Sequence, residues 1–241
     1  MTETDRPPYN NTRFKIKNYD WDLFRGPHAG DPAPEFTVTD LETGQAVSLS
    51  DYRGRWLVIE TGSSTCSMYT KNIPGMEDLR SEYPDVDFVV IYVREAHPGE
   101  RLHQHKNFDE KVSAAKLLKP RYKENRRVLV DDHAGSFHQP YGMKPNFIYV
   151  IRPDGIVHYR CDWAYVDGLR EALNDRENLH TLEHADIDKL HAARGMGIAI
   201  RTMWTGGLIA LWDFFAAGPE LVKRHQFEDE YYEKHGRFRN E

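Results

Sequence analysis

The chain has 241 residues, of which 29% are charged and 12% aromatic, a composition that supports a packed core rather than intrinsic disorder. Its net charge of −6 argues against a protein that binds the nucleic-acid backbone, because such proteins usually carry a basic face. Two cysteines are too few for a disulfide-stapled secreted framework or a four-cysteine zinc site. We therefore expect a cytoplasmic protein that binds no nucleic acid and has a single thiol as its candidate reactive group.

Neither end of the chain predicts a membrane or export signal. The first 17 residues contain acids, scattered bases and no apolar core of a signal peptide. The most apolar stretch, residues 196–217, is interrupted by Arg201 and Asp213. The 11 residues between these two charges cannot cross a hydrocarbon layer, which needs ~20. We therefore expect no transmembrane segment.

The pattern of elements divides the chain into an irregular arm (1–29), an α/β domain (30–176) and a helical extension (177–241). Two short strands joined at residues 42–44 open the domain. Further apolar runs predict strands at 56–61, 87–93, 127–132, 146–151 and 156–160. Helical segments are expected at 66–83, where Pro74 breaks or kinks the helix, and at 109–119 and 164–174. Strands that alternate with helices and end in a hairpin indicate a thioredoxin-like mixed central sheet flanked by helices.

The extension predicts three helical stretches: residues 180–195, an apolar stripe within 196–217, and a charged helix over 219–238. We expect the stripe to pack on the core or across a homodimer. The alternative is a helix that lies in a membrane interface. Acids and bases alternate in the last helix, without the Lys/Arg excess that an anionic membrane would favour.

The most informative segment is the turn that ends in Cys66. It follows a buried strand and opens a helix, where free backbone N–H groups and the helix dipole stabilise a thiolate. The sequence therefore predicts a Cys66 pKa below the usual ~8.5. Gly62 allows a tight turn, and the hydroxyls of Ser63, Ser64 and Thr65 are candidates to hydrogen-bond the thiolate or to cap the helix.

Three motifs resemble the iodothyronine deiodinase family, within a redoxin-type opening. Residues 62–66 (Gly-Ser-Ser-Thr-Cys) are similar to the family's Gly-Ser-Cys-Thr-selenocysteine turn. Residues 92–98 resemble its Tyr-x-x-Glu-Ala-His-Pro strand ending, and residues 105–118 resemble its His-containing segment before an Ala-Ala helix. The resemblance covers about residues 30–175 and implies a thioredoxin-like fold.

The resemblance implies a thiol oxidoreductase in which Cys66 replaces the selenocysteine nucleophile. Such an enzyme reduces a carbon–halogen bond or a related soft electrophile, and Glu95 and His97 handle the proton. An external thiol of the glutathione or thioredoxin type then restores the cysteine, and no bound cofactor is expected. The resemblance also implies that Tyr92 and Thr65 support the proton-handling pair and that His105 contacts the polar end of a substrate. We further expect Ser63, Ser64 and Trp163 to bind substrate.

Two departures from the family pattern bear on substrate and turnover. Ser64 stands where the family has a cysteine two residues before its nucleophile, so that thiol relay is missing. No arginine matches the family's substrate-clamping Gly-Gly-Arg, although Arg160 lies close in sequence. The missing arginine argues against thyroid hormone as the substrate.

Cys161 is either a packing residue or a resolving thiol; the second role requires its Cα within about 7 Å of that of Cys66.

Two other functions remain open. A thiol peroxidase could use the same cysteine, but the Pro-x-x-x-Thr-x-x-Cys motif is absent at Ile59 and Ser63, and Cys-x-x-Cys is absent as well. A non-enzymatic thioredoxin-fold interaction module is the third interpretation.

Pro145, just before a predicted strand, is a candidate cis-proline opposite the nucleophile. The histidine clusters at 103–105 and 131–133 lack metal-ligand spacing, so we expect no metal site.

Overall fold

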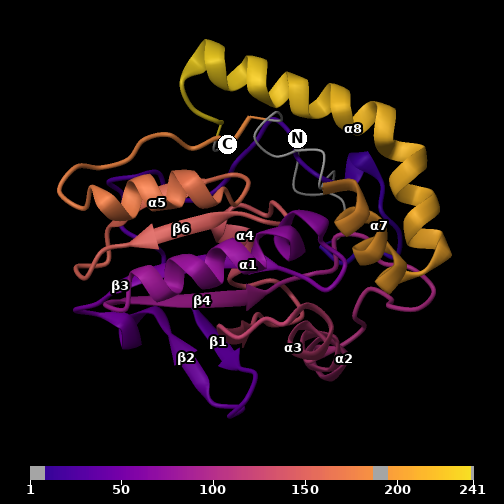
Figure 1. Cartoon of the computed structure of the whole chain (residues 1–241), viewed down its shortest axis with the longest axis horizontal. Coiled ribbons are helices and arrows are strands. Elements are labelled where there is room, and N and C mark those ends of the chain that lie inside the picture. Colours follow the sequence, from indigo (N-terminus) through magenta and orange to yellow (C-terminus); the bar gives the residue numbers. More distant parts are fainter. Residues whose placement is uncertain (1–8, 187–194, 240–241) are drawn as a thin grey trace.

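The computed structural model describes residues 9–186 and 195–239, and it centres on a seven-stranded mixed sheet (Figure 1). The strand order across the sheet is β2-β1-β5-β4-β3-β6-β7. In chain order the strands are β1 (Thr37–Asp40), β2 (Ala46–Ser48), β3 (Trp56–Gly62), β4 (Val86–Tyr92), β5 (Arg127–Val130), β6 (Ile148–Ile151) and β7 (Val157–Cys161).

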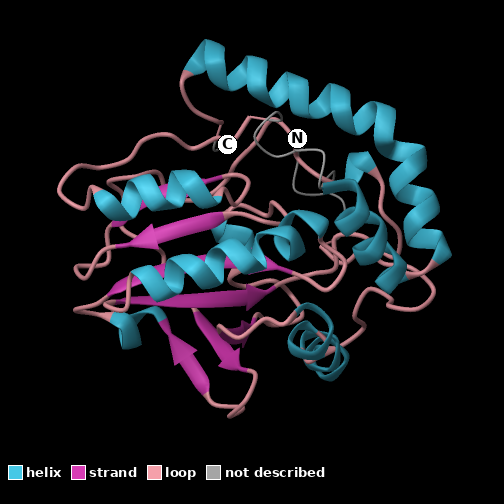
Figure 2. Ribbon diagram, in the orientation of Figure 1, coloured by secondary structure: helices cyan, strands magenta, loops and turns pink. Residues whose placement is uncertain are grey.

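Helices lie on both faces of this sheet (Figure 2). They are α1 (Ser67–Glu82), α2 (Phe108–Ala115), α3 (Leu118–Tyr122), α4 (His138–Tyr141), α5 (Val166–Asn174), α7 (Gly195–Gly206) and α8 (Leu208–His235), with short 3-10 turns η2 (Ile16–Asn18) and η3 (Leu49–Tyr52). The β3, β4 and β5 strands are parallel, whereas β6 and β7 are antiparallel to their neighbours. This arrangement confirms the predicted thioredoxin-like α/β fold.

The core forms because successive strand side chains point to opposite faces of the sheet. On one face, Leu57 and Ile59 of β3 pack with aromatic residues of α4 and of the arm. On the other, Val58 packs with residues of α1 and α5. Near the carboxyl end of β4, Val90 and Tyr92 meet α1 and α2.

The predicted strands of the domain are all present, and the helices differ in detail. Helix α1 runs without interruption through Pro74 rather than breaking there. The segment expected as one helix at 109–119 is two, because α2 ends at Ala115 and α3 starts at Leu118. The short helix α4 was not predicted.

The extension differs most from the sequence prediction. Residues 180–186 are not helical, and residues 187–194 lie outside the described part of the chain. The backbone of 180–186 instead bonds to the sheet edge: His180 N donates to His158 O over 3.1 Å, and Asp162 N donates to Glu183 O over 2.8 Å. These bonds to β7 and to Asp162, the residue after it, replace the hydrogen bonds within a helix.

The apolar stripe and the charged segment form a helical hairpin with a different boundary from the one expected. Gly207, with φ of +108°, separates α7 from α8, and α8 then continues through Pro219. The Glu100 carboxylate accepts the backbone N–H groups of Leu208 and Ile209 and so caps α8. In Figure 1, α8 runs along the outer edge of the molecule.

This hairpin presents one face to the core and another to solvent. Thr70 of α1 and Thr202 of α7 share a hydrogen bond of 2.7 Å, and Met203 and Ala210 are buried. The outward face is apolar and exposed, with side chains of Ile200, Trp204, Leu208, Ile209 and Trp212. None of the helices in the described ranges is both long and apolar enough to span a bilayer.

The N-terminal arm is irregular, as expected, but it is an integral part of the core. Trp21 and Phe24 are buried. The guanidinium of Arg160 in β7 donates to the backbone carbonyls of Phe24, Arg25 and Gly26 over 3.0–3.2 Å. Arg160 therefore holds the arm against the sheet.

Candidate active site

Cys66 lies at the N-cap of α1, immediately after the turn that follows β3. Its backbone is extended, and its N–H closes the turn by donating to Ser63 O over 3.1 Å. Gly62 pairs with Tyr92 in the parallel register of β3 and β4. The carboxyl ends of these two strands therefore place the Cys66 turn beside the loop that carries Glu95 and His97.

The structure contradicts the prediction of a low Cys66 pKa. Burial raises the pKa of the thiol to about 12, and the negative charges of Glu60 and Glu95 act in the same direction. The backbone N–H groups of Tyr69 and Met68, at the start of α1, lower the pKa as predicted but are outweighed. The helix N-terminus is present, but desolvation of the thiolate dominates.

The hydroxyls of the turn hold neighbouring backbone rather than the thiol. Ser63 Oγ accepts the Ala96 N–H over 3.2 Å, and Ser64 Oγ donates to Ala114 O over 3.0 Å. Both serines are fully buried and neither borders the cavity described below. Their geometry therefore fits bracing of the turn rather than capping of α1.

Glu95 is a fully enclosed acceptor at the centre of the site. Its Oε2 accepts both the N–H (3.0 Å) and the hydroxyl (2.6 Å) of Thr65, and Tyr92 donates its hydroxyl to Oε1. His105 Nε2 lies 3.2 Å from Oε1. Burial opposes ionisation of Glu95, but His105, Thr65 and Tyr92 together outweigh it and lower the pKa of the carboxyl. Glu95 is therefore held as a carboxylate.

His97 is linked to Glu95 through Thr65, and not by a direct bond to its ring. The His97 N–H donates to Thr65 Oγ1 over 3.0 Å. The ring lies against Phe14, with centroids 4.2 Å apart, and meets Phe214 edge-on at 5.6 Å. Its buried Nδ1 has no hydrogen-bond partner among the described residues. Burial lowers the pKa of His97 to about 4, although Asp213 and Glu95 oppose this shift.

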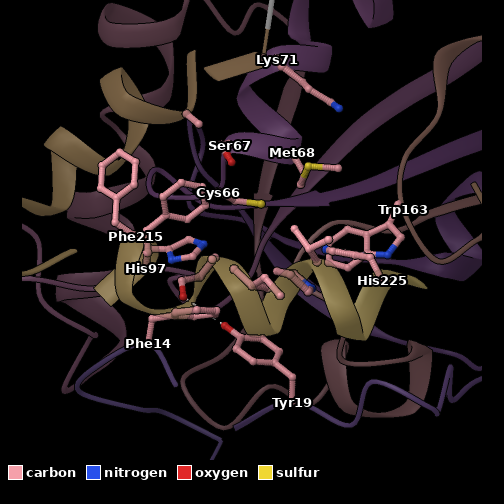
Figure 3. A pocket seen from close by; sticks show the side chains of 18 of the residues that line it. Phe14, Tyr19, Cys66, Ser67, Met68, Lys71, His97, Trp163, Phe215 and His225 are labelled. Atoms are coloured by element: carbon pink, nitrogen blue, oxygen red, sulfur yellow. Dashed lines mark hydrogen bonds between the residues drawn. The ribbon is translucent and has the colours of Figure 1, made fainter. Parts of the chain in front are cut away.

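Cys66 and His97 border the same cavity of about 430 Å³ (Figure 3). Its wall is mostly apolar and aromatic and is assembled from the arm, the start of α1, the loop after β4, α7 and α8. The other lining residues that the figure labels are Phe14, Tyr19, Ser67, Met68, Lys71, Trp163, Phe215 and His225. A cavity of this size and character accommodates a small organic molecule.

The remaining predicted site residues divide between the cavity wall and its support. Trp163 and Pro145 both line the cavity. The prediction of a cis peptide bond at Pro145 is wrong, because the described part of the chain contains no cis peptide bond. His105 is buried beside Glu95 and does not line the cavity. Cys161 is a free, fully buried thiol on β7 and is likewise absent from the cavity wall. Its role as a resolving thiol stays a prediction.

Sequence reasoning missed a buried ionic network behind Cys66. Arg126 Nη1 donates to Glu60 Oε2 over 2.7 Å, and Arg126 also pairs with Glu124. Tyr69 of α1 donates its hydroxyl to Glu124 over 2.7 Å. Glu60 within an otherwise apolar strand was the available signal, because a buried carboxylate needs a partner. This network anchors the first turn of α1 below Cys66.

Sequence reasoning also missed how the arm and the extension enclose the site. Phe14 and Tyr19 come from the arm, and Lys71 from the second turn of α1. Burial lowers the pKa of Lys71 to about 8.

Within the described ranges, no group of three or more His, Cys, Asp or Glu side chains is arranged to hold a metal ion.

Comparison with known proteins gives one family and one fold. A family model described as iodothyronine deiodinase matches residues 8–175. The thyroxine 5-deiodinase of Sus scrofa is 34% identical over 149 residues, covering 57% of this chain and 48% of that protein. The thyroxine 5-deiodinase of Homo sapiens is 30% identical over 149 residues, covering 57% and 49%. The chain thus spans about half the length of the curated relatives it matches.

A solved structure supports the fold alone. A hypothetical protein from Sinorhizobium meliloti superposes with a TM-score of 0.51 at 15% identity, covering 67% of this chain and 92% of that one. The family match ends at residue 175, so α7 and α8 lie beyond it.

Proposed function

The chain belongs to the iodothyronine deiodinase family, and we propose that it is a thiol oxidoreductase that removes halogen from an organic substrate by reduction. Cys66 is the nucleophile, and His97 moves the proton. The observation that carries the proposal is their placement: a thiol at a helix N-cap and an imidazole with an unpartnered buried nitrogen border one apolar cavity.

The proposed chemistry starts from a neutral thiol and a neutral imidazole. Burial raises the pKa of Cys66 and lowers that of His97, so neither is charged in the empty site near pH 7. As the halogen approaches, the thiol proton passes to His97 and the thiolate attacks the halogen. The carbon–halogen bond breaks, its electron pair stays on carbon, and His97 returns the proton to that carbon. The products are the dehalogenated substrate and a Cys66 sulfenyl halide.

Turnover requires two equivalents of an external thiol. The first displaces halide from the sulfenyl halide and forms a mixed disulfide with Cys66; the second releases the Cys66 thiol and leaves the external thiol as a disulfide. Halide and a proton are released. We propose a glutathione- or thioredoxin-type reductant, and the missing relay cysteine at Ser64 supports a mechanism with one protein thiol.

Glu95 acts in this proposal as a positioning residue. Its carboxylate fixes Thr65, which in turn holds the backbone of His97. Tyr92 and His105 keep the carboxylate ionised and in place. Trp163 contacts the substrate from the cavity wall, whereas Ser63 and Ser64 hold the turn that carries Cys66.

The test is iodide release from 2-iodo-4-methylphenol with excess dithiothreitol, compared with consumption of hydrogen peroxide in a separate assay. We expect iodide release from the wild type, none from Cys66→Ser, and retention of activity in Cys161→Ala. Peroxide consumption that depends on Cys66, without iodide release, would support the thiol peroxidase alternative. No Cys66-dependent turnover of either compound would leave only an interaction module.

A further inference from the structure

The cavity beside Cys66 is closed by helices that lie outside the family match. Nine of the twenty described residues that line it come from α7 and α8. They include Ala199 of α7 and Phe214 and Leu221 of α8. The family match ends at residue 175, so the part of the chain that carries Cys66 and His97 does not itself build this wall.

The tyrosine and tryptophan side chains that line the cavity have their polar groups engaged by the protein itself. Tyr19 donates its hydroxyl to Ala96 O over 3.1 Å, and Trp21 donates its indole N–H to Ile16 O over 2.8 Å. The indole N–H of Trp163 is directed to Glu228 Oε2 at 3.4 Å. Because these polar groups are already engaged, the surface offered to a ligand is apolar.

The described part of the cavity wall offers no matched pair of charges to a zwitterionic ligand. None of the described residues that line it is Arg, Asp or Glu. Arg160, the nearest arginine in sequence to the family's clamp, is fully buried against the arm carbonyls and Glu183. Glu228, behind the wall, is paired with Lys144. A carboxylate or ammonium brought into this space would lose its hydration without a matched counter-charge.

Among the described residues that line the cavity, Lys71 is the one lysine, and none is an arginine. The Lys71 residue is half-buried. Burial lowers its pKa to about 8, which weakens its charge in mildly alkaline solution. A single flexible ammonium also gives no bidentate recognition of a carboxylate, which an arginine would provide.

We propose that α7 and α8 determine substrate specificity, and that the wall they form selects a ring-bearing organohalide without a charged amino-acid head. This inference rests on the proposed function, since it names the substrate class of the same site. Leu221 and Phe214 form the inner wall. Met196 and Phe215 both line the cavity and are 56% and 52% exposed, so they mark its mouth.

The first experiment compares two substrates that share one reacting ring. In 3-iodotyrosine and 2-iodo-4-methylphenol the iodine is ortho to a phenol hydroxyl, and only the former carries an amino-acid head. We expect kcat/KM for 2-iodo-4-methylphenol to exceed that for 3-iodotyrosine by tenfold or more. Equal values, or a preference for 3-iodotyrosine that Lys71→Met removes, would overturn the inference.

The second experiment tests the wall itself. Leu221→Ala removes apolar surface from the cavity, and we expect about a tenfold rise in KM for 2-iodo-4-methylphenol with little change in kcat. Trp212→Ala is the matched control, because Trp212 is also an apolar residue of α8 but is 72% exposed and does not line the cavity. Equal KM values for the two variants, with both folded by circular dichroism, would contradict the assignment.

A third measurement separates failure of the inference from failure of the proposed function. Binding of both iodinated phenols to Cys66→Ser is measured by calorimetry, which needs no turnover. Tighter binding of 2-iodo-4-methylphenol, weakened by Leu221→Ala in the same background, supports the inference even if the wild type releases no iodide. Absence of binding, or tighter binding of 3-iodotyrosine, overturns it whatever the activity.

Discussion

The hydroxyl of Thr65 donates to Glu95 Oε2 over 2.6 Å and, through the same oxygen, accepts the backbone N–H of His97 over 3.0 Å. One side chain thus joins the Cys66 turn to the loop that carries the His97 imidazole. All three residues are buried, with at most 9% of the residue surface exposed. Through Thr65, the backbone of His97 is tied to the Glu95 carboxylate without a hydrogen bond to the His97 ring.

The first prediction concerns this hydroxyl. Thr65→Val keeps the shape of the side chain but removes the donor and acceptor, so Glu95 and the His97 N–H each lose a partner. We expect a tenfold or greater fall in kcat for iodide release, with KM changed less, and a loss of ~1–3 kcal/mol in the free energy of unfolding. Thr65→Ser keeps the hydroxyl and is expected to retain most of kcat. Equal kcat values for the two variants would show that the hydroxyl does not position His97.

The second prediction concerns the reactivity of Cys66. Because burial raises the pKa of its thiol to about 12, we expect alkylation of the folded protein by iodoacetamide to be slow at pH 7 and to keep rising above pH 8.5. The assay is mass spectrometry in a Cys161→Ala background, which leaves one thiol. A midpoint of alkylation below pH 8.5 would show that the N-terminus of α1 outweighs desolvation.

The local features of this site could be predicted from sequence, and the distant ones could not. The strand β3, the turn and the start of α1 follow from a continuous apolar run, small residues and helix formers between residues 56 and 82. The raised pKa of Cys66 could not be predicted in this way, because α7, α8 and the arm, which surround the cavity, are far from Cys66 in the chain.

Contacts with a distant part of the chain also explain why the helix predicted to start at residue 180 is absent over 180–186. The helical pattern of that segment is real, but its backbone groups find partners at Asp162, directly after β7: the Asp162 N–H donates to Glu183 O, and the Ala185 N–H donates to the Asp162 carboxylate. Tertiary hydrogen bonds override local propensity here.

A distant residue also sets the boundary at Gly207. The positive φ of Gly207 divides the apolar stripe into two helices, and Glu100, from another part of the chain, caps the second helix at this corner.

The third prediction concerns acid stability. The folded state keeps His97 neutral down to about pH 4, whereas the unfolded chain takes up a proton near pH 6.5. The free energy of unfolding should therefore fall as pH falls from 6.5 to 4, by at most ~1.4 kcal/mol per pH unit from this residue. Urea unfolding of wild type and His97→Gln at pH 7.0, 5.5 and 4.5 measures it. The wild type should lose more stability than the variant across this range, and parallel losses would contradict the low pKa.

The last prediction concerns the buried ion pair that holds α8 against the cavity. Lys144 donates to Glu228 and, over 3.0 Å, to Trp21 O, and Glu228 also accepts from the His225 ring at 3.1 Å. Lys144→Met leaves a buried carboxylate without its cation, so we expect a loss of ~3–5 kcal/mol in the free energy of unfolding. Restoring neutrality in the double variant Lys144→Met/Glu228→Gln should recover part of that loss.

A surface pair on the same helix provides the control for this ion pair. Arg224 and Glu220 lie 3.9 Å apart with about half of each side chain exposed, and Arg224→Ala should leave stability unchanged because water screens the pair. Urea unfolding measures all three variants. Because His225 lines the cavity, Lys144→Met should also raise KM for 2-iodo-4-methylphenol, whereas Arg224→Ala should not. If Lys144→Met and Arg224→Ala proved equally mild in both measurements, the buried ion pair would have no part in holding α8 or in shaping the site.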